Sequence, residues 1–210
     1  MENESTNRYL ETISNIISII FHPVFLPVYG LLIIFNAPTF MVHLPAGLKR
    51  VIFTLATINM TVVPLAIMPF LRHRNLISSY KMDSRQERLI PLTVGAMMYI
   101  VTSIIFYSYQ IPQLIKSFTL AAAVVSVLIL LITFRWKISA HAAGMGALLA
   151  CVMVLSVKMM TNLSAFWIPV LLFSGLVLSA RMFLKSHNPA QIYMGYITGF
   201  IPVFLVMMIF

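Results

Sequence analysis

The chain has 210 residues, of which 60% are hydrophobic and 9% are charged, and its formal net charge is +9. Soluble globular domains are about half apolar and about a quarter charged, so this composition excludes an ordinary soluble fold. Apolar runs of the roughly 20 residues that span a bilayer recur along most of the chain. We therefore predict one integral membrane domain that covers residues 1–210.

Seven apolar runs bounded by charged or turn residues are candidate membrane spans. In chain order they cover residues 13–37, 49–71, 90–110, 114–134, 141–160, 163–182 and 189–210. None of them alternates apolar and polar residues as barrel strands do, and lipid leaves no partner for unpaired backbone groups. The sequence thus predicts an all-α, polytopic transmembrane helical bundle with six or seven spans.

The first run has two features that set it apart. It follows a polar, acidic start without a cleavage pattern, so we do not expect a removable signal peptide. It also contains Pro23 and Pro27, in FHPVFLP, and proline interrupts helical hydrogen bonding. The run is therefore either a kinked spanning helix or a re-entrant segment, and the second alternative leaves six spans.

Basic residues gather on one membrane face in this topology. The loops around 72–88, 135–141 and 181–188 emerge together because two spans separate each from the next. This face receives Arg72, Arg74, Lys81, Arg85, Arg88, Arg135, Lys137, Arg181 and Lys185, and the opposite face receives Lys49, Arg50, Lys116 and Lys158. The positive-inside rule alone explains such a bias, and which side this face occupies stays open.

Three segments on the basic face place cations and histidines at fixed spacings. They are KMDSRQERLIP with Lys81 and Arg88, WKISAHAAGMG with Ser139 and His141, and ARMFLKSHNPAQIYMG with Arg181, His187 and Gln191. Arginine and lysine around two histidines suit a multiply charged oxyanion such as phosphate.

Helix starts strengthen this interpretation. Asn188, Pro189 and Gln191 fit the N-cap, first-turn and capping-box positions of the last helix, so His187 should lie directly before its positive end. Ser139 should likewise precede the helix that carries His141. Free backbone donors at helix starts bind phosphate oxygens.

In this order the segments resemble the signatures KxxxxxxRP, PSGH and SRxxxxxHxxxD of the type 2 phosphatidic acid phosphatase superfamily, a group of membrane lipid phosphatases. The similarity covers 81–195 and includes Gly195 of HNPAQIYMG. It departs from the pattern in three places. Pro91 stands three residues after Arg88, ISAH replaces PSGH, and Gln191 replaces the aspartate.

The resemblance implies a metal-independent lipid phosphate phosphatase or phosphotransferase without a cofactor. In the family mechanism, His187 attacks phosphorus to form a phosphohistidine, and His141 protonates the leaving alcohol and later activates water. Lys81, Arg88 and Arg181 would hold phosphate oxygens, and Ser139 would add hydrogen bonds. Gln191 can accept a hydrogen bond from the nucleophile but supplies no negative charge.

The expected partners are a lipid phosphate substrate and membrane lipids, without nucleic acid, in a multi-pass protein of a bacterial inner membrane. The substrate stays open among phosphatidic acid, phosphatidylglycerophosphate, a polyprenyl pyrophosphate and a phosphorylated lipid A. His22, His43 and His73 lack a matching carboxylate or cysteine set, so no metal site is expected.

Three other functions remain open. Gln191 favours a catalytically silent relative that binds phospholipid headgroups. The broken first run favours a transporter or channel, although an intramembrane acidic relay is not evident. A prenyl transferase would need paired aspartate-rich motifs, which the loop DSRQER does not provide.

Overall fold

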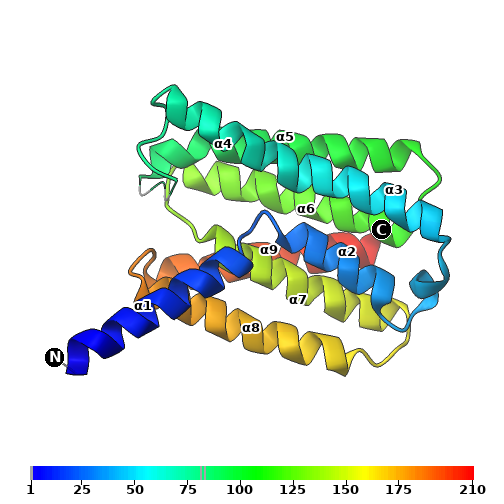
Figure 1. Cartoon of the computed structure of the whole chain (residues 1–210). Helices are drawn as coiled ribbons and strands as arrows, with labels where there is room; N and C mark the ends of the chain where they lie inside the picture. The colour runs from blue at the N-terminus through cyan, green and yellow to red at the C-terminus, as the bar shows by residue number, and fades with distance from the viewer. Residues whose placement is uncertain (1, 81, 83) are drawn as a thin grey trace.

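A computed structural model describes residues 2–80, 82 and 84–210, and the regular elements within these residues are all helical (Figure 1). In chain order they are α1 (Glu2–Ile20), α2 (Leu26–Asn36), the 3-10 turn η1 (Phe40–His43), α3 (Ala46–Thr57), the π-helical η2 (Ile58–Val62), α4 (Val63–His73), α5 (Arg85–Ser108), α6 (Gln113–Thr133), α7 (Ala140–Lys158), α8 (Ser164–Phe183) and α9 (Pro189–Ile209).

Six of these helical units are long and apolar enough to cross a membrane. One is the continuous 28-residue unit Ala46–His73, made of α3, η2 and α4, and the others are α5 to α9. The predicted all-α transmembrane bundle is therefore confirmed. Pro64 and Pro69 lie within this first unit, where the adjoining π-helical turn locally rearranges the hydrogen bonding.

The first predicted run is broken rather than continuous. α1 ends at Ile20 and α2 begins at Leu26, and α2 has only 11 residues. Tertiary hydrogen bonds satisfy the broken backbone: the Thr61 hydroxyl donates to the Val24 carbonyl at 2.7 Å, and the Tyr29 hydroxyl donates to the Ile20 carbonyl at 2.9 Å. These bonds supply partners for two of the carbonyl groups that the break leaves outside regular helix.

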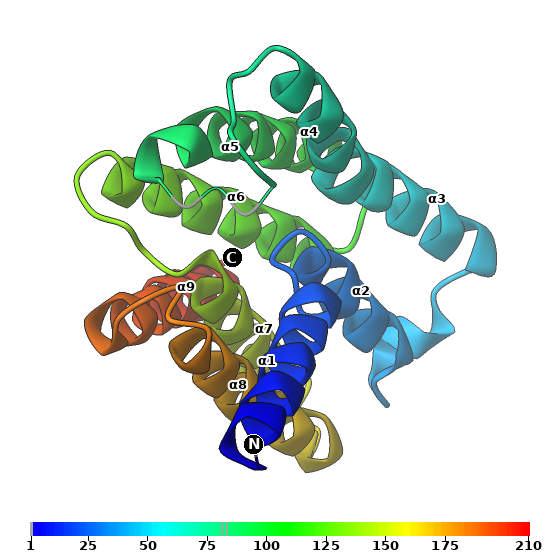
Figure 2. The same cartoon turned by 60° about the vertical axis from the view of Figure 1, so that its left-hand side comes forward.

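The helix α7 is the most buried of the six spans and lies at the centre of the bundle. It packs against α2, α6, α8 and α9, whereas α5 packs between α6 and the α3–η2–α4 unit on the other side (Figure 1). α1 lies beside α8, as Figure 2 shows.

Small residues bring α7 and α9 unusually close. A Cβ built on Gly199 would overlap the Ala143 carbonyl, and one built on Gly195 would lie 2.6 Å from the Ser139 carbonyl oxygen. Glycine spaced four residues apart is a common device for such close packing between membrane helices. The Ser139 N–H also donates to the Gln191 carbonyl at 3.2 Å, so the starts of both helices are joined.

The loops with the predicted site residues emerge at one end of the bundle. The connections α4–α5, α6–α7 and α8–α9 all lie at the left end in Figure 1, where α1 also begins. The sequence motifs, although spread over a hundred residues, thus meet at one end.

Candidate functional site

A cavity of about 980 Å³ opens at this end and continues between the helices. Its outer part is basic, and its deeper walls are apolar. The basic part is lined by Arg88, Lys137, His141, Arg181, Lys185 and His187. The deeper part includes Leu92, Phe118, Val125, Leu148 and Val203. The volume is at the upper end of the range for small-molecule sites, about 300–1,000 Å³.

His187 lies between α8 and α9 and is only 7% exposed. Its Nδ1–H donates to Gln191 Oε1 at 3.0 Å, and the Asn188 backbone N–H donates to the same oxygen at 3.3 Å. Because a backbone N–H can only donate, the second bond fixes which end of the Gln191 amide faces the ring. His187 therefore carries its proton on Nδ1 and keeps the lone pair on Nε2.

The surroundings of His187 keep its ring neutral. Burial lowers the pKa of His187 to about 4, and the positive charges of Arg88, Arg181 and Lys137 act in the same direction. The hydrogen bond with Gln191 opposes them only in part. At neutral pH the Nε2 lone pair is thus available as a nucleophile.

Asn188 and Gln191 build the predicted capping box at the start of α9. Asn188 Oδ1 accepts from the Gln191 N–H at 2.9 Å, and Pro189 occupies the first turn. The capping prediction is confirmed. Gln191 consequently has two tasks, because the oxygen that closes the box also orients His187.

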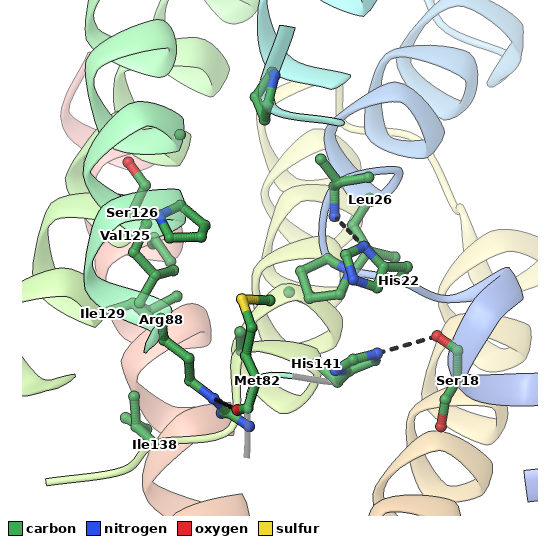
Figure 3. A pocket seen from close by; sticks show the side chains of 18 of the residues that line it. Ser18, His22, Leu26, Met82, Arg88, Val125, Ser126, Ile129, Ile138 and His141 are labelled. Carbon is green, nitrogen blue, oxygen red and sulfur yellow. Dashed lines mark hydrogen bonds between the residues drawn. The ribbon is translucent and has the colours of Figure 1, made fainter. Parts of the chain in front are cut away.

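His141 is the second residue of α7 and lines the cavity. Its Nε2–H donates to the Ser18 carbonyl at 3.0 Å (Figure 3). A carbonyl only accepts, so Nε2 carries a proton and Nδ1 is the nitrogen of His141 that can exchange one.

Two arginines reach the cavity from different helices. Arg181, in the last turn of α8, donates from Nη1 to the Ser18 hydroxyl at 3.4 Å. Its Nε is buried and has no hydrogen-bond partner among the described residues. Arg88, on α5, donates from Nε to the Met82 carbonyl at 2.8 Å (Figure 3). A buried guanidinium N–H without a partner suits an anionic oxygen.

The start of α5 is tied to the neighbouring loops. The Ser84 side chain caps the helix by accepting from the Glu87 N–H at 3.3 Å, and Glu87 accepts from the Ser78 N–H at 2.8 Å. Arg85 donates to the Arg135 carbonyl at 2.7 Å. These bonds hold Arg88 beside the cavity. Lys81, the other cation predicted in this segment, lies outside the described residues.

Ser139 does not line the cavity. It is fully buried as the N-cap of α7, and its hydroxyl accepts from the Ala142 N–H at 3.4 Å. A direct bond to phosphate, the role that the resemblance implies, does not fit this placement. The hydrogen bond from the Ser139 N–H to the Gln191 carbonyl holds Ser139 behind the cavity wall. From there Ser139 positions His141 and the start of α9.

The sequence interpretation missed the contribution of α1. Ser18 contacts both His141 and Arg181, and the ring of His22 lies 5.3 Å from that of His141, centroid to centroid. A signal was present, because Glu11, Asn15, Ser18 and His22 recur at helical spacing and all line the cavity.

The described residues do not include a group of three or more His, Cys, Asp or Glu side chains that could hold a metal ion. The site instead combines cations, two histidines and an apolar chamber. No family model, curated protein or solved structure matches the chain, so the resemblance to membrane lipid phosphatases rests on the three short sequence motifs alone.

Proposed function

We propose that the protein is a lipid phosphate phosphatase, or a related phosphotransferase, of a bacterial inner membrane. The observation that carries the proposal is the two-part cavity, with two histidines and several cations at one end and apolar helix walls beyond. A lipid phosphate has the same two parts, because its dianionic headgroup needs cationic donors and its tail needs an apolar chamber.

In the first step, the Nε2 lone pair of His187 attacks phosphorus and the bond between phosphorus and the ester oxygen breaks. The leaving alkoxide takes a proton from Nδ1 of doubly protonated His141. Arg88 and Arg181 neutralise the negative charge on the phosphoryl oxygens. The products are the lipid alcohol and a phosphohistidine at His187.

In the second step, His141 Nδ1 accepts a proton from water while the water oxygen attacks phosphorus. The bond between His187 Nε2 and phosphorus breaks, and its electron pair returns to Nε2. Inorganic phosphate leaves. An acceptor alcohol in place of water would give phosphotransfer by the same route. These residues supply nucleophile, acid and charge, so the mechanism needs no metal.

Hydrolysis of lipid phosphates by the purified full-length chain tests the proposal. We expect phosphate release from at least one of phosphatidic acid, phosphatidylglycerophosphate, a polyprenyl pyrophosphate or a phosphorylated lipid A, with a chelator present. His187→Ala should abolish it, by a factor of a thousand or more on the order expected for loss of a nucleophile. His43→Ala is the matched control, because His43 lies in η1 at the far end of the bundle.

A phosphorylated His187 trapped by rapid alkaline quench and located by peptide mass spectrometry would support the covalent step. Turnover that survives His187→Ala would contradict it. A wild type that binds these lipids but hydrolyses none would favour the silent relative, for which the neutral Gln191 beside His187 is the supporting observation.

A further inference from the structure

The N-terminal arm, which we define as α1 and the turn 21–25, forms one wall of the cavity. Its apolar face points away from the bundle, since Ile13 and Ile20 are about half exposed (52% and 49%). Its polar face includes Ser18 and His22 and lines the cavity. The arm thus turns its apolar face toward the lipid and its polar face toward the cavity.

The turn holds His22 in a fixed place. The Val24 carbonyl accepts from Thr61 of η2 at 2.7 Å, and the Phe25 N–H donates to the His22 carbonyl at 2.9 Å. The ring of His22 also meets the ring of Phe25 edge-on, with centroids 6.3 Å apart. A side chain held in this manner is preorganised for a ligand.

Hydrogen bonding also fixes the tautomer of His22. The Val24 N–H donates to His22 Nδ1 at 3.4 Å. A nitrogen that accepts must have a lone pair, so the proton of the neutral ring is on Nε2. Because His22 lines the cavity, it brings a donor N–H to the cavity wall.

His22 lies deeper in the bundle than His141. Figure 3 shows it between His141 and Leu26. The side chain of Leu26 packs on Gly144, about one helical turn beyond His141 on α7. Beside Leu26 the cavity walls are mostly apolar and include Val125 (Figure 3). Ser126 also lines this part, and its hydroxyl donates to the Ala123 carbonyl at 2.8 Å. His22 therefore marks the boundary between the phosphate end and the tail chamber.

We propose that His22 determines substrate specificity by donating a hydrogen bond to an oxygen in the linkage between the phosphate and the lipid tail. An acylglycerol phosphate has ester oxygens a few bonds from phosphorus, and a lipid whose phosphate binds at His187 would extend these oxygens toward His22, whereas an alkyl or polyprenyl monophosphate has only carbon there. An alkyl or polyprenyl monophosphate would leave the His22 N–H without an acceptor, and this makes its binding free energy less favourable than that of an acylglycerol phosphate. The inference rests on the proposed function and selects acylglycerol phosphates over alkyl and polyprenyl monophosphates.

Two substrates and two variants test this role in the full-length chain in detergent. Dioctanoyl phosphatidic acid has the ester oxygens, and dodecyl phosphate does not. We expect His22→Phe, which keeps a ring without N–H, to lower kcat/KM for phosphatidic acid about tenfold and to leave that for dodecyl phosphate within about twofold. His22→Gln, whose amide N–H reaches about as far as Nε2, should restore most of the loss.

Binding gives a second readout that does not need turnover. In a His187→Ala background, His22→Phe should weaken the Kd for phosphatidic acid but not for dodecyl phosphate. Equal losses on both lipids, or a loss on neither, would overturn the inference. An unchanged kcat/KM and Kd for dodecyl phosphate would show that the variants are folded. If the wild type hydrolyses neither this pair nor the other lipid phosphates, the proposed function fails, and the ratio of the two Kd values still decides the role of His22.

Discussion

At the scale of single residues, the pair His187 and Gln191 shows how a neutral side chain can fill part of a carboxylate's place. The amide oxygen sets the His187 tautomer, since it accepts from Nδ1 at 3.0 Å. It cannot stabilise the positive charge that develops when Nε2 bonds to phosphorus. Orientation is preserved in this pair, and charge stabilisation is missing.

Because Gln191 orients His187 without adding a negative charge, the effect of Gln191→Glu can be predicted. Glutamate has the same length as glutamine, so both hydrogen bonds to the oxygen at this position can remain while a negative charge is added. We expect the pKa of His187 to rise and the hydrolysis rate to increase about tenfold, the equivalent of one pKa unit. Gln191→Asp has the same charge on a shorter side chain and should raise the rate less.

Phosphatidic acid turnover and histidine NMR measure the two effects. Gln191→Met is the matched control, because it keeps the side-chain length without the acceptor and should lower the rate. A rate that falls in Gln191→Glu and persists in Gln191→Met would show that our assignment of Gln191 is wrong.

The neutrality of His187 also predicts a pH dependence of stability. Its pKa is about 4 in the folded protein against about 6.5 in an unfolded chain, so between these values the unfolded state binds more protons. The stability that His187 contributes is full above pH 6.5 and is lost as the pH falls toward 4. Between pH 7 and pH 5 this loss is about 2 kcal/mol.

Unfolding midpoints of the wild type and His187→Gln in the same detergent at pH 7 and pH 5 test this sign. The substitution should make the fall in stability smaller. An equal fall in the two proteins would mean that His187 does not remain neutral when folded.

At the scale of elements, the distance between α7 and α9 sets the site. Gly195 and Gly199 let α9 approach Ser139 and Ala143, and this approach joins the helix starts that carry His141 and His187. A methyl group at Gly199 would meet backbone rather than a flexible side chain, so the helices must separate.

We therefore predict that Gly199→Ala destabilises the protein by about 1–3 kcal/mol and reduces hydrolysis, although no cavity residue changes. Gly175→Ala is the control, because a Cβ at Gly175 on α8 meets nothing within 4 Å. Thermal unfolding in detergent and phosphatidic acid turnover provide the two measurements. Equal effects of the two substitutions would argue against close packing of α7 and α9.

The same elements show what the sequence could and could not predict. Apolar run lengths fix the long helices, and the Asn188, Pro189 and Gln191 pattern fixes the start of α9, because both depend on local chemistry. The place of Ser139 before α7 was predicted, but its burial away from the cavity was not, because its depth depends on how closely α9 approaches. The place of His22 at the cavity was missed because it depends on the break between α1 and α2. The Thr61 hydroxyl holds this break through the Val24 carbonyl, 37 positions earlier in the chain.

At the scale of the whole molecule, the basic end and the far end should lie on opposite sides of the membrane. The unit Ala46–His73 has 28 residues and at 1.5 Å per residue is about 42 Å long, which exceeds the roughly 30 Å hydrocarbon core. The loops of the site and its helix starts all lie at one end of this unit (Figure 1). All residues of the site should therefore face the same side of the membrane.

Cysteine labelling can test this arrangement, because the native Cys151 is fully buried and should react poorly. Arg74→Cys and Arg135→Cys place thiols on exposed positions at the basic end, and Gly47→Cys and Tyr109→Cys place them at the far end. With a membrane-impermeant maleimide on sealed vesicles, we expect the first pair to label together and the second pair only after the vesicles are opened, or the reverse. The reason is that each pair is separated from the other by an odd number of crossings. Labelling of Arg74→Cys and Gly47→Cys from the same side would mean that Ala46–His73 does not span. Labelling of Arg74→Cys and Arg135→Cys from opposite sides would mean that the loops of the site do not share one face.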